Sequence, residues 1–325
     1  MIRTLTREMG KRLTFSVLTI WVGVAPTAFG QERPNEVVQE RPRGIASAKA
    51  DLLAMTSLWK GDRCSDGRPR VSDDLLKRMN AVSIEEAWDV LRQKGYENQF
   101  VGGWQMLHQD RPFVGRALTA AFLPSRPDLV EPIMREGKKE GRIGPSNSWP
   151  IDMLQKGDVY IADGFSKVAD GTLIGDNLGN AIYARTGTGV VFDAGARDPD
   201  GLKKIEGFNA FVRGWDPSFL KNSVLSSINR PIRIGPVTVL PGDVIVAKRE
   251  GVIAIPAHLA EEVVVTAEIV ALKDEFGHAR LRAGIYTPGQ IDVPWTDPIK
   301  ADFFKWLESR PDKPPIANTL IEKHL

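Results

Sequence analysis

The chain of 325 residues contains one cysteine, Cys64, and four histidines. A single cysteine cannot form an intramolecular disulfide, so the fold must rest on its hydrophobic core. The histidines, at positions 108, 258, 278 and 324, are scattered and lack the close spacing of zinc ligands. The sequence therefore excludes a disulfide-stapled scaffold and gives no sign of a metal centre built on cysteine or histidine.

The chain also lacks a strong charge of either sign, because its formal net charge is only +2 at pH 7. Part of the positive excess lies in the first twelve residues, so the remainder has no basic field that would attract nucleic acid. The glycines of Gly187-Thr188-Gly189 precede an apolar run, whereas a dinucleotide-binding fingerprint follows a strand. Neither a nucleic-acid partner nor NAD binding is predicted.

The apolar run at the N-terminus, Leu13 to Ala25, is too short for a comfortable membrane span. Basic residues precede it and the small residues of Ala28-Phe29-Gly30 follow it, which is the pattern of a secretory signal peptide over residues 1–30. We therefore expect an exported protein, periplasmic or secreted, with no membrane association after signal removal. An uncleaved N-terminal membrane anchor is the alternative.

The rest of the chain divides by composition. Residues 31–44 are polar and proline-bearing, which predicts a linker. Residues 45–285 interleave predicted strands and helices, which favours one α/β domain. Within it, Ser83 and Glu86 form a capping-box pattern, residues 215–229 read as an irregular excursion, and residues 231–246 as two short strands. Residues 286–325 hold aromatic residues among prolines and are interpreted as a C-terminal arm.

The stretch from Gly175 to Asp198 carries the most chemistry. Residues 177–185 have the apolar stripe of a short helix, and residues 189–192 form a continuous apolar run typical of a buried parallel strand. Asp176 stands beside the predicted helix start, while Arg197 and Asp198 follow the strand. Ligands collect beyond the carboxyl ends of parallel strands, and a helix N-terminus offers free N–H groups to a carboxylate. This layout predicts a site for a small anion.

Each of these residues also has a structural explanation. Asp198 precedes Pro199, and Asp followed by Pro is what an N-cap with proline at the first helical position looks like. Asp176 is a favoured capping residue for the same reason, and Arg197 could simply pair with Asp198 or Asp193. One arginine and two acids around a single helix and strand are nevertheless more than capping requires.

The segment Gly175-Asp176-Asn177-Leu178 followed by Arg197-Asp198, together with GDVYIAD at 157–163 and residues 235–263, resembles the RraA-like family. That family contains class II 4-hydroxy-4-methyl-2-oxoglutarate aldolases and the regulator of ribonuclease activity A. The resemblance covers roughly residues 75–275. It implies a layered α/β fold of the swivelling β/β/α type with N- and C-terminal extensions, and a homotrimer or hexamer with active sites near subunit interfaces.

The resemblance also implies roles for individual residues. Asp198 corresponds to the ligand of Mg²⁺ or Mn²⁺, Arg197 to the arginine that stabilises the substrate carbonyl, and Asp176 to the acid that activates water. Substrate binding falls to Gly175, Asn177, Leu178 and Arg197. The implied reaction is cleavage of a small 2-oxo acid through a pyruvate enolate, either retro-aldol cleavage or oxaloacetate decarboxylation. A non-catalytic regulatory or binding protein on the same scaffold is the alternative.

Overall fold

The computed structural model describes residues 44–311 and 316–325. The predicted signal peptide over residues 1–30 and all but the last residue of the predicted linker lie outside these described residues. Within them, no helix combines the length and the apolar character that crossing a bilayer requires.

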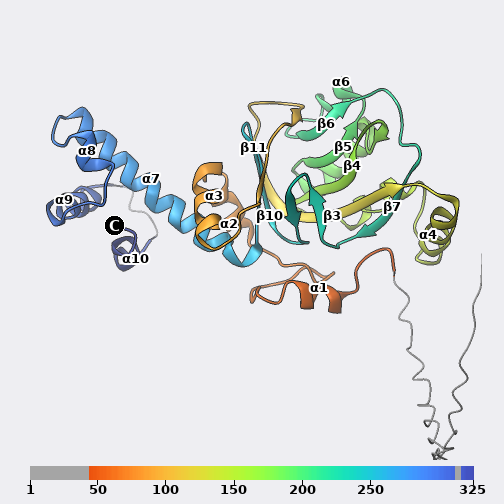
Figure 1. Ribbon diagram of the computed structural model, residues 1–325, viewed down its shortest axis with the longest axis horizontal. Coiled ribbons are helices and arrows are strands. Elements are labelled where there is room, and N and C mark those ends of the chain that lie inside the picture. Colours follow the sequence, from red (N-terminus) through yellow and green to blue (C-terminus); the bar gives the residue numbers. More distant parts are fainter. Residues whose placement is uncertain (1–43, 312–315) are drawn as a thin grey trace, which may run out of the picture. The chain divides into compact units, whose positions relative to one another are not determined.

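The centre of the fold is a sheet whose inner strands are parallel. β3 (Phe113–Pro124), β4 (Asp158–Thr172), β5 (Val190–Ala196) and β6 (Ala210–Trp215) lie side by side in chain order (Figure 1). β5 is buried along its whole length, as its unbroken apolar run predicts. The ends of β4, β5 and β6 are consequently neighbours, and the loops that follow these strands can share a site.

Antiparallel strands complete the sheet on both sides. β10 (Val244–Lys248) pairs with β3, β11 (Gly251–Ile255) with β10, and β1 (Phe100–Val101) with β11. β2 (Gln105–Met106) pairs with β6 at the opposite edge. β7 (Ser223–Ile228) pairs with the distal half of β3. The parallel strands thus lie in the interior of a mixed sheet, which confirms the predicted α/β class.

The two faces of the sheet carry different layers. On one face, alternate residues such as Leu118, Tyr160 and Phe192 pack beneath helices. On the other face, their neighbours pack beneath a hairpin of β8 (Ile232–Ile234) and β9 (Val237–Val239). This period-2 alternation separates a hairpin layer from a helix layer across the sheet.

The helix layer has two groups (Figure 1). α5 (Asp176–Thr186) and α6 (Pro199–Leu202) pack at the parallel strands, together with the short helices η1 (Ser146–Ser148) and η2 (Ile151–Met153). α4 (Pro127–Lys139) contacts β7. The second group covers β10 and β11 and comprises α2 (Asp73–Met79), α3 (Ile84–Gln93), η3 (Ala257–Leu259) and α7 (Ala260–Arg282). The capping box of Ser83 and Glu86 is confirmed at the start of α3.

Two further parts extend this core. α1 (Lys49–Met55) belongs to the N-terminal segment, residues 44–72, which precedes α2. At the other end, α8 (Pro288–Ile291), α9 (Asp297–Glu308) and α10 (Asn318–Glu322) pack with the second half of α7 around Phe276, Trp295 and Phe303. An ion pair of 2.7 Å between Arg280 and Asp302 joins α7 to α9. The aromatic residues of the tail therefore form a small core of their own.

Two predictions about the elements are wrong. Residues 215–229 are not an irregular excursion, because β7 lies within them and continues the sheet along β3. Its sequence, SVLSSI, has little apolar periodicity, so the strand depends on tertiary pairing rather than on local propensity. Residues 231–246 contain β8, β9 and the start of β10, which makes three strands instead of the two predicted. β8 and β9 form a separate hairpin before β10.

Candidate active site

The predicted site residues come from two connections that meet at one end of the parallel strands. Gly175 is the N-cap residue of α5, so Asp176 is the first residue in the helix. Arg197 and Asp198 follow β5 and precede α6. The backbone N–H of Arg197 donates to the carbonyl of Ile174 at 3.0 Å, which ties the two connections together.

Asp198 occupies an N-cap position without acting as a cap. Pro199 is the first residue of α6, as the capping explanation requires, but the Asp198 side chain makes no capping hydrogen bond. Its backbone lies in the left-handed region at φ 58°, which is uncommon for a residue other than glycine. The Asp198 carboxylate is therefore free for another role, and its side chain remains 37% exposed.

Arg197 lies beside that carboxylate. Its Nη1 is 3.4 Å from Asp198 Oδ2, and its own side chain is 42% exposed. Asp193, the other acid considered as its partner, instead accepts a 2.6 Å hydrogen bond from Arg213 Nε. Exposed ion pairs contribute little to stability, so we do not regard this pair as a stabilising contact. It matters because it places a positive and a negative charge side by side.

The absence of a side chain at Gly175 leaves room for the Asp198 carboxylate. A Cβ built on Gly175 would overlap Asp198 Oδ2 and come 3.2 Å from Arg197 Nε. A similar relationship exists at Gly201 of α6, where a Cβ would lie 2.7 Å from Asp176 Oδ2. Asp198 thus lies against the glycine that caps α5, Asp176 lies against a glycine of α6, and Arg197 pairs with Asp198.

A small cavity of about 90 Å³ adjoins these residues. Four predicted substrate-binding residues line it: Gly175, Asn177, Leu178 and Arg197. The N–H of Asn177 is already engaged, since Asp176 Oδ1 accepts it at 2.8 Å. The binding role of this N–H stays a prediction, and a substrate carboxylate would have to share or displace that contact.

The remaining wall of the cavity was missed at the sequence level. Asn147 lines it and donates from Nδ2 to the Leu173 carbonyl at 2.8 Å. Phe219 and Leu220 also line it, although their segment was expected to be irregular. The side chain of Phe219 is 59% exposed. The only sequence signal was an aromatic residue in an otherwise polar segment, which is too weak to locate a site.

The segment that carries Phe219, residues 216–222 between β6 and β7, is nevertheless held in place. The backbone N–H of Asp170 donates to Ser218 Oγ at 2.7 Å, and the N–H of Lys221 donates to the Asp170 carbonyl at 2.8 Å. Asp170 belongs to the irregular distal part of β4, where the register with β5 shifts. These contacts fix an exposed aromatic ring at the cavity wall.

A second group of charges lies on the hairpin face of the sheet, away from Arg197. Asp193 Oδ1 accepts hydrogen bonds from Arg213 Nε and from Ser166 Oγ, whereas Oδ2 is buried and has no partner among the described residues. Burial raises the pKa of nearby Asp163, and the negative charge of Asp193 raises it further. Sequence reasoning did not single out this group.

The donor set fits a hard divalent cation held mainly by water. Among the described residues, no three side chains of His, Cys, Asp or Glu gather as a metal site. Mg²⁺ and Mn²⁺ prefer oxygen ligands, and Mg²⁺ is usually held by one or two carboxylates while it keeps several waters. Asp198 can supply one such carboxylate, because it is partly exposed, unused as a cap and left room by Gly175.

Comparisons with known proteins cover the part of the chain that builds this site. Residues 71–254 match the RraA-like family, described as Aldolase/RraA. The chain is 26% identical over 212 residues to Protein DlpA of Legionella pneumophila, a match that covers 65% of this chain. The same match spans only 31% of DlpA, so most of that relative has no counterpart in the alignment.

Solved structures share the fold. RraAS2 of Streptomyces coelicolor, described as an unusual member of the RNase ES inhibitor RraA protein family, is 24% identical with a TM-score of 0.56. That match covers 65% of this chain and 100% of RraAS2. An uncharacterized protein from Pseudomonas syringae pv. tomato is 23% identical with a TM-score of 0.57, and the match covers 69% and 95% of the two chains. At these identities the likeness concerns the fold alone.

Proposed function

This chain belongs to the RraA-like family, and on that premise we propose that it is a divalent-metal-dependent lyase acting on a small 2-oxo acid. The family includes class II aldolases as well as non-catalytic regulators, so membership alone does not decide between them. The supporting observation is that Arg197 lines the cavity and pairs with Asp198, which is left unused as a helix cap, while Asp176 is the first residue of α5, whose N-cap Gly175 also lines the cavity.

The reaction we propose uses each residue in turn. The substrate carboxylate binds at the N-terminus of α5, where N–H groups and the helix dipole favour an anion. The Arg197 guanidinium lies beside the C2 carbonyl oxygen and stabilises the negative charge that develops there. Asp176 accepts the proton of the C4 hydroxyl, directly or through a water molecule that it activates, as the C3–C4 bond breaks. The bonding electrons form the pyruvate enolate, a carbonyl product leaves, and protonation at C3 gives pyruvate.

Asp198 would hold the metal ion, Mg²⁺ or Mn²⁺. When bound, such a cation polarises the carbonyl and stabilises the enolate. Oxaloacetate decarboxylation passes through the same enolate, with CO₂ as the leaving product, so Arg197 would serve both reactions, whereas the base role of Asp176 belongs to the retro-aldol cleavage alone. RraA-like aldolases are metal-dependent in general, which is consistent with this role.

The alternative is a regulatory or binding protein on this scaffold. The considerable exposure of Arg197 and Asp198 favours it, because electrostatic catalysis is strongest where water is excluded. Oligomerisation would reconcile the exposure of Arg197 and Asp198 with catalysis, because a neighbouring subunit can cover the site. RraA family members are oligomeric. We therefore propose a homotrimer or hexamer, which light scattering of the purified protein would test.

The deciding experiment measures pyruvate release by the purified chain from 4-hydroxy-4-methyl-2-oxoglutarate and from oxaloacetate, with Mg²⁺, with Mn²⁺ and with EDTA. We expect metal-dependent release that falls at least about 100-fold in Arg197→Ala and in Asp198→Ala. Asp200→Ala is the matched control, because this neighbouring acid is 95% exposed and its ion pair with Lys203 is long, at 3.9 Å. Absence of release from both substrates, with no thermal stabilisation by either metal, would leave the binding protein as the explanation.

Export remains part of the proposal. Fractionation of cells that express the full-length chain would place it in the periplasm or medium, and mass determination of the mature protein would show whether residues 1–30 are removed. A protein that stays in the cytoplasm at full mass would contradict this proposal.

A further inference from the structure

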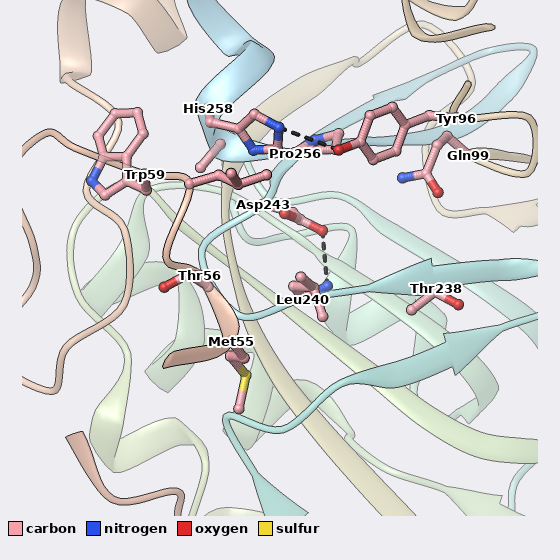
Figure 2. A pocket seen from close by; sticks show the side chains of 12 residues that line it. Met55, Thr56, Trp59, Tyr96, Gln99, Thr238, Leu240, Asp243, Pro256 and His258 are labelled. Carbon is pink, nitrogen blue, oxygen red and sulfur yellow. Dashed lines mark hydrogen bonds between the residues drawn. The ribbon is translucent and has the colours of Figure 1, made fainter. Parts of the chain in front are cut away.

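A larger cavity of about 280 Å³ lies at a separate place in the fold. Its wall combines the end of α1 and the residues after it, the β9–β10 turn and the start of η3, as Figure 2 shows. None of its lining residues lines the cavity at Gly175. It is therefore independent of the proposed catalytic site.

One wall of this cavity belongs to the N-terminal segment rather than to the family core. Met55, Leu58 and Trp59 line the cavity, and all three precede residue 71, where the family match begins. Their side chains are apolar or aromatic, and that of Leu58 is 63% exposed. Residues outside the family match thus form one apolar wall of the cavity, and the sheet and η3 form the rest of it.

Hydrogen bonds hold that wall in place. Arg63 Nη1 donates to Thr56 Oγ1 at 2.8 Å, and Arg63 Nη2 donates to the carbonyls of Thr56 at 2.9 Å and Trp59 at 3.2 Å. Trp59 Nε1 donates to the Asp62 carbonyl at 2.7 Å. A wall fixed in this way is preorganised, which lowers the entropic cost of binding a ligand.

The charged group of the cavity is an acid without a cationic partner in the lining. Asp243 is 5% exposed, and its Oδ2 accepts the N–H of Leu240 at 2.8 Å. No lysine or arginine is among the twelve residues that line the cavity. Burial raises the pKa of the Asp243 carboxyl to about 7, and the backbone N–H groups of Leu240 and Ala257 only partly offset this effect.

The neighbouring polar groups are neutral. His258 Nε2 and the Tyr96 hydroxyl are 3.2 Å apart, and burial lowers the pKa of His258. Figure 2 places Asp243 between His258 and Leu240, with Trp59 on one side and Tyr96 on the other. An anion would therefore meet an acid and no cation, whereas an ammonium group would meet a carboxylate and two aromatic rings.

We propose that this cavity is a second ligand site, which binds a small organic amine with an apolar or aromatic body. The ammonium group pairs with Asp243, and the body packs against Trp59 and Leu240. Such a ligand differs in charge from the 2-oxo acid of the first site, so the two sites do not compete for one molecule.

The test uses 2-phenylethylamine as the probe, with 2-phenylethanol and 3-phenylpropanoate as neutral and anionic counterparts. Calorimetric titration of the full chain at pH 8 should show the amine binding at least about tenfold more tightly than either counterpart. Trp59→Leu should weaken amine binding about tenfold by removing aromatic contact, and Asp243→Asn should abolish the preference for the amine over the alcohol. Asp200→Ala, the exposed control variant used above, should bind the amine as the unchanged chain does.

The two variants protect the test against misfolding. Asp243 is buried, so a melting curve must first show that Asp243→Asn is folded. Trp59 is only half-buried, so its replacement spares the core. Equal binding of amine and alcohol, or an amine affinity unchanged in both variants, would overturn the proposal. Dissociation of an oligomer by Trp59→Leu would also overturn it, because the wall would then be a contact between copies of the chain. Pyruvate release is not a readout here, so failure of this proposal leaves the proposed function untouched.

Discussion

Arg68 Nη2 donates to Asp158 Oδ2 across 2.9 Å, and neither side chain has any exposed surface. Arg68 belongs to the N-terminal segment, whereas Asp158 begins β4, so this pair fastens the segment to the sheet. Asp66 supports it by accepting a hydrogen bond from Arg68 Nε at 2.7 Å. The segment is thus tied to the core by a charge pair as well as by apolar contacts.

Arg68→Ala should destabilise the protein by about 3–5 kcal/mol, because it removes the 2.9 Å ion pair of a buried carboxylate and leaves Asp158 with Arg116 Nε at 3.7 Å and the Gln155 N–H. Arg70→Ala is the control. Its side chain is 48% exposed and 3.9 Å from Asp73, so the loss should be at most about 1 kcal/mol. Urea unfolding of the two variants measures the difference in the free energy of unfolding. Equal midpoints would show that the buried pair does not stabilise the attachment of the N-terminal segment.

Gly175→Ala should disable the site without unfolding the protein. The backbone at Gly175 is extended at φ −122°, so alanine is compatible with the local conformation. The added Cβ would, however, push the Asp198 carboxylate away. We expect metal-dependent pyruvate release to fall at least about tenfold while the melting temperature changes little. Gly289→Ala, where no atom lies within 4 Å of an added Cβ, should leave both quantities unchanged.

The buried acid of the larger cavity should make stability depend on pH. The folded-state pKa of Asp243 is raised to about 7, while an unfolded aspartate titrates near about 3.9. The folded state therefore binds more protons between these values, and the contribution of Asp243 to stability is lost as pH rises from about 4 to about 7. The upper bound of this loss is about 4 kcal/mol.

His258 and Tyr96 face the same cavity, and the lowered pKa of His258 acts in the opposite direction by adding stability as pH rises. Comparing the unchanged chain with Asp243→Asn across pH 4 to 8 removes that common term. The unchanged chain should lose stability relative to the variant as pH rises. Parallel curves of the two proteins would mean that Asp243 titrates at its ordinary value.

The position of the candidate site in the fold was predictable from sequence to the extent that it depends on local structure. Asp176, Arg197 and Asp198 flank one helix and one strand, and the chain that joins them fixes where they meet. The apolar periods of the helix and the strand therefore indicated where these residues lie, while their roles came from the family resemblance; the capping rule located the start of α3 at Ser83.

What sequence could not supply depends on tertiary contacts. β7 exists because β3 extends far enough to pair with it, and Phe219 reaches the cavity because Ser218 binds the irregular part of β4. The larger cavity likewise needs Trp59 and His258 to come together from positions far apart in the chain. None of these relationships leaves a local periodic signal.

Phe219 gives the last prediction, which rests on the proposed function. Its exposed ring shares a cavity wall with Leu178 and Leu220, and Arg197 is the only cationic residue in the lining. A 4-hydroxy-2-oxo acid with an apolar group at C4 can pack on this wall. Phe219→Ala should raise KM for such a substrate about three- to tenfold, since contacts of this size are worth on the order of 1 kcal/mol, and leave oxaloacetate decarboxylation largely unchanged. Leu123→Ala, another exposed apolar position, should alter neither reaction. An equal loss for both substrates in Phe219→Ala would mean that the ring shapes the site as a whole instead of contacting the substrate's C4 group.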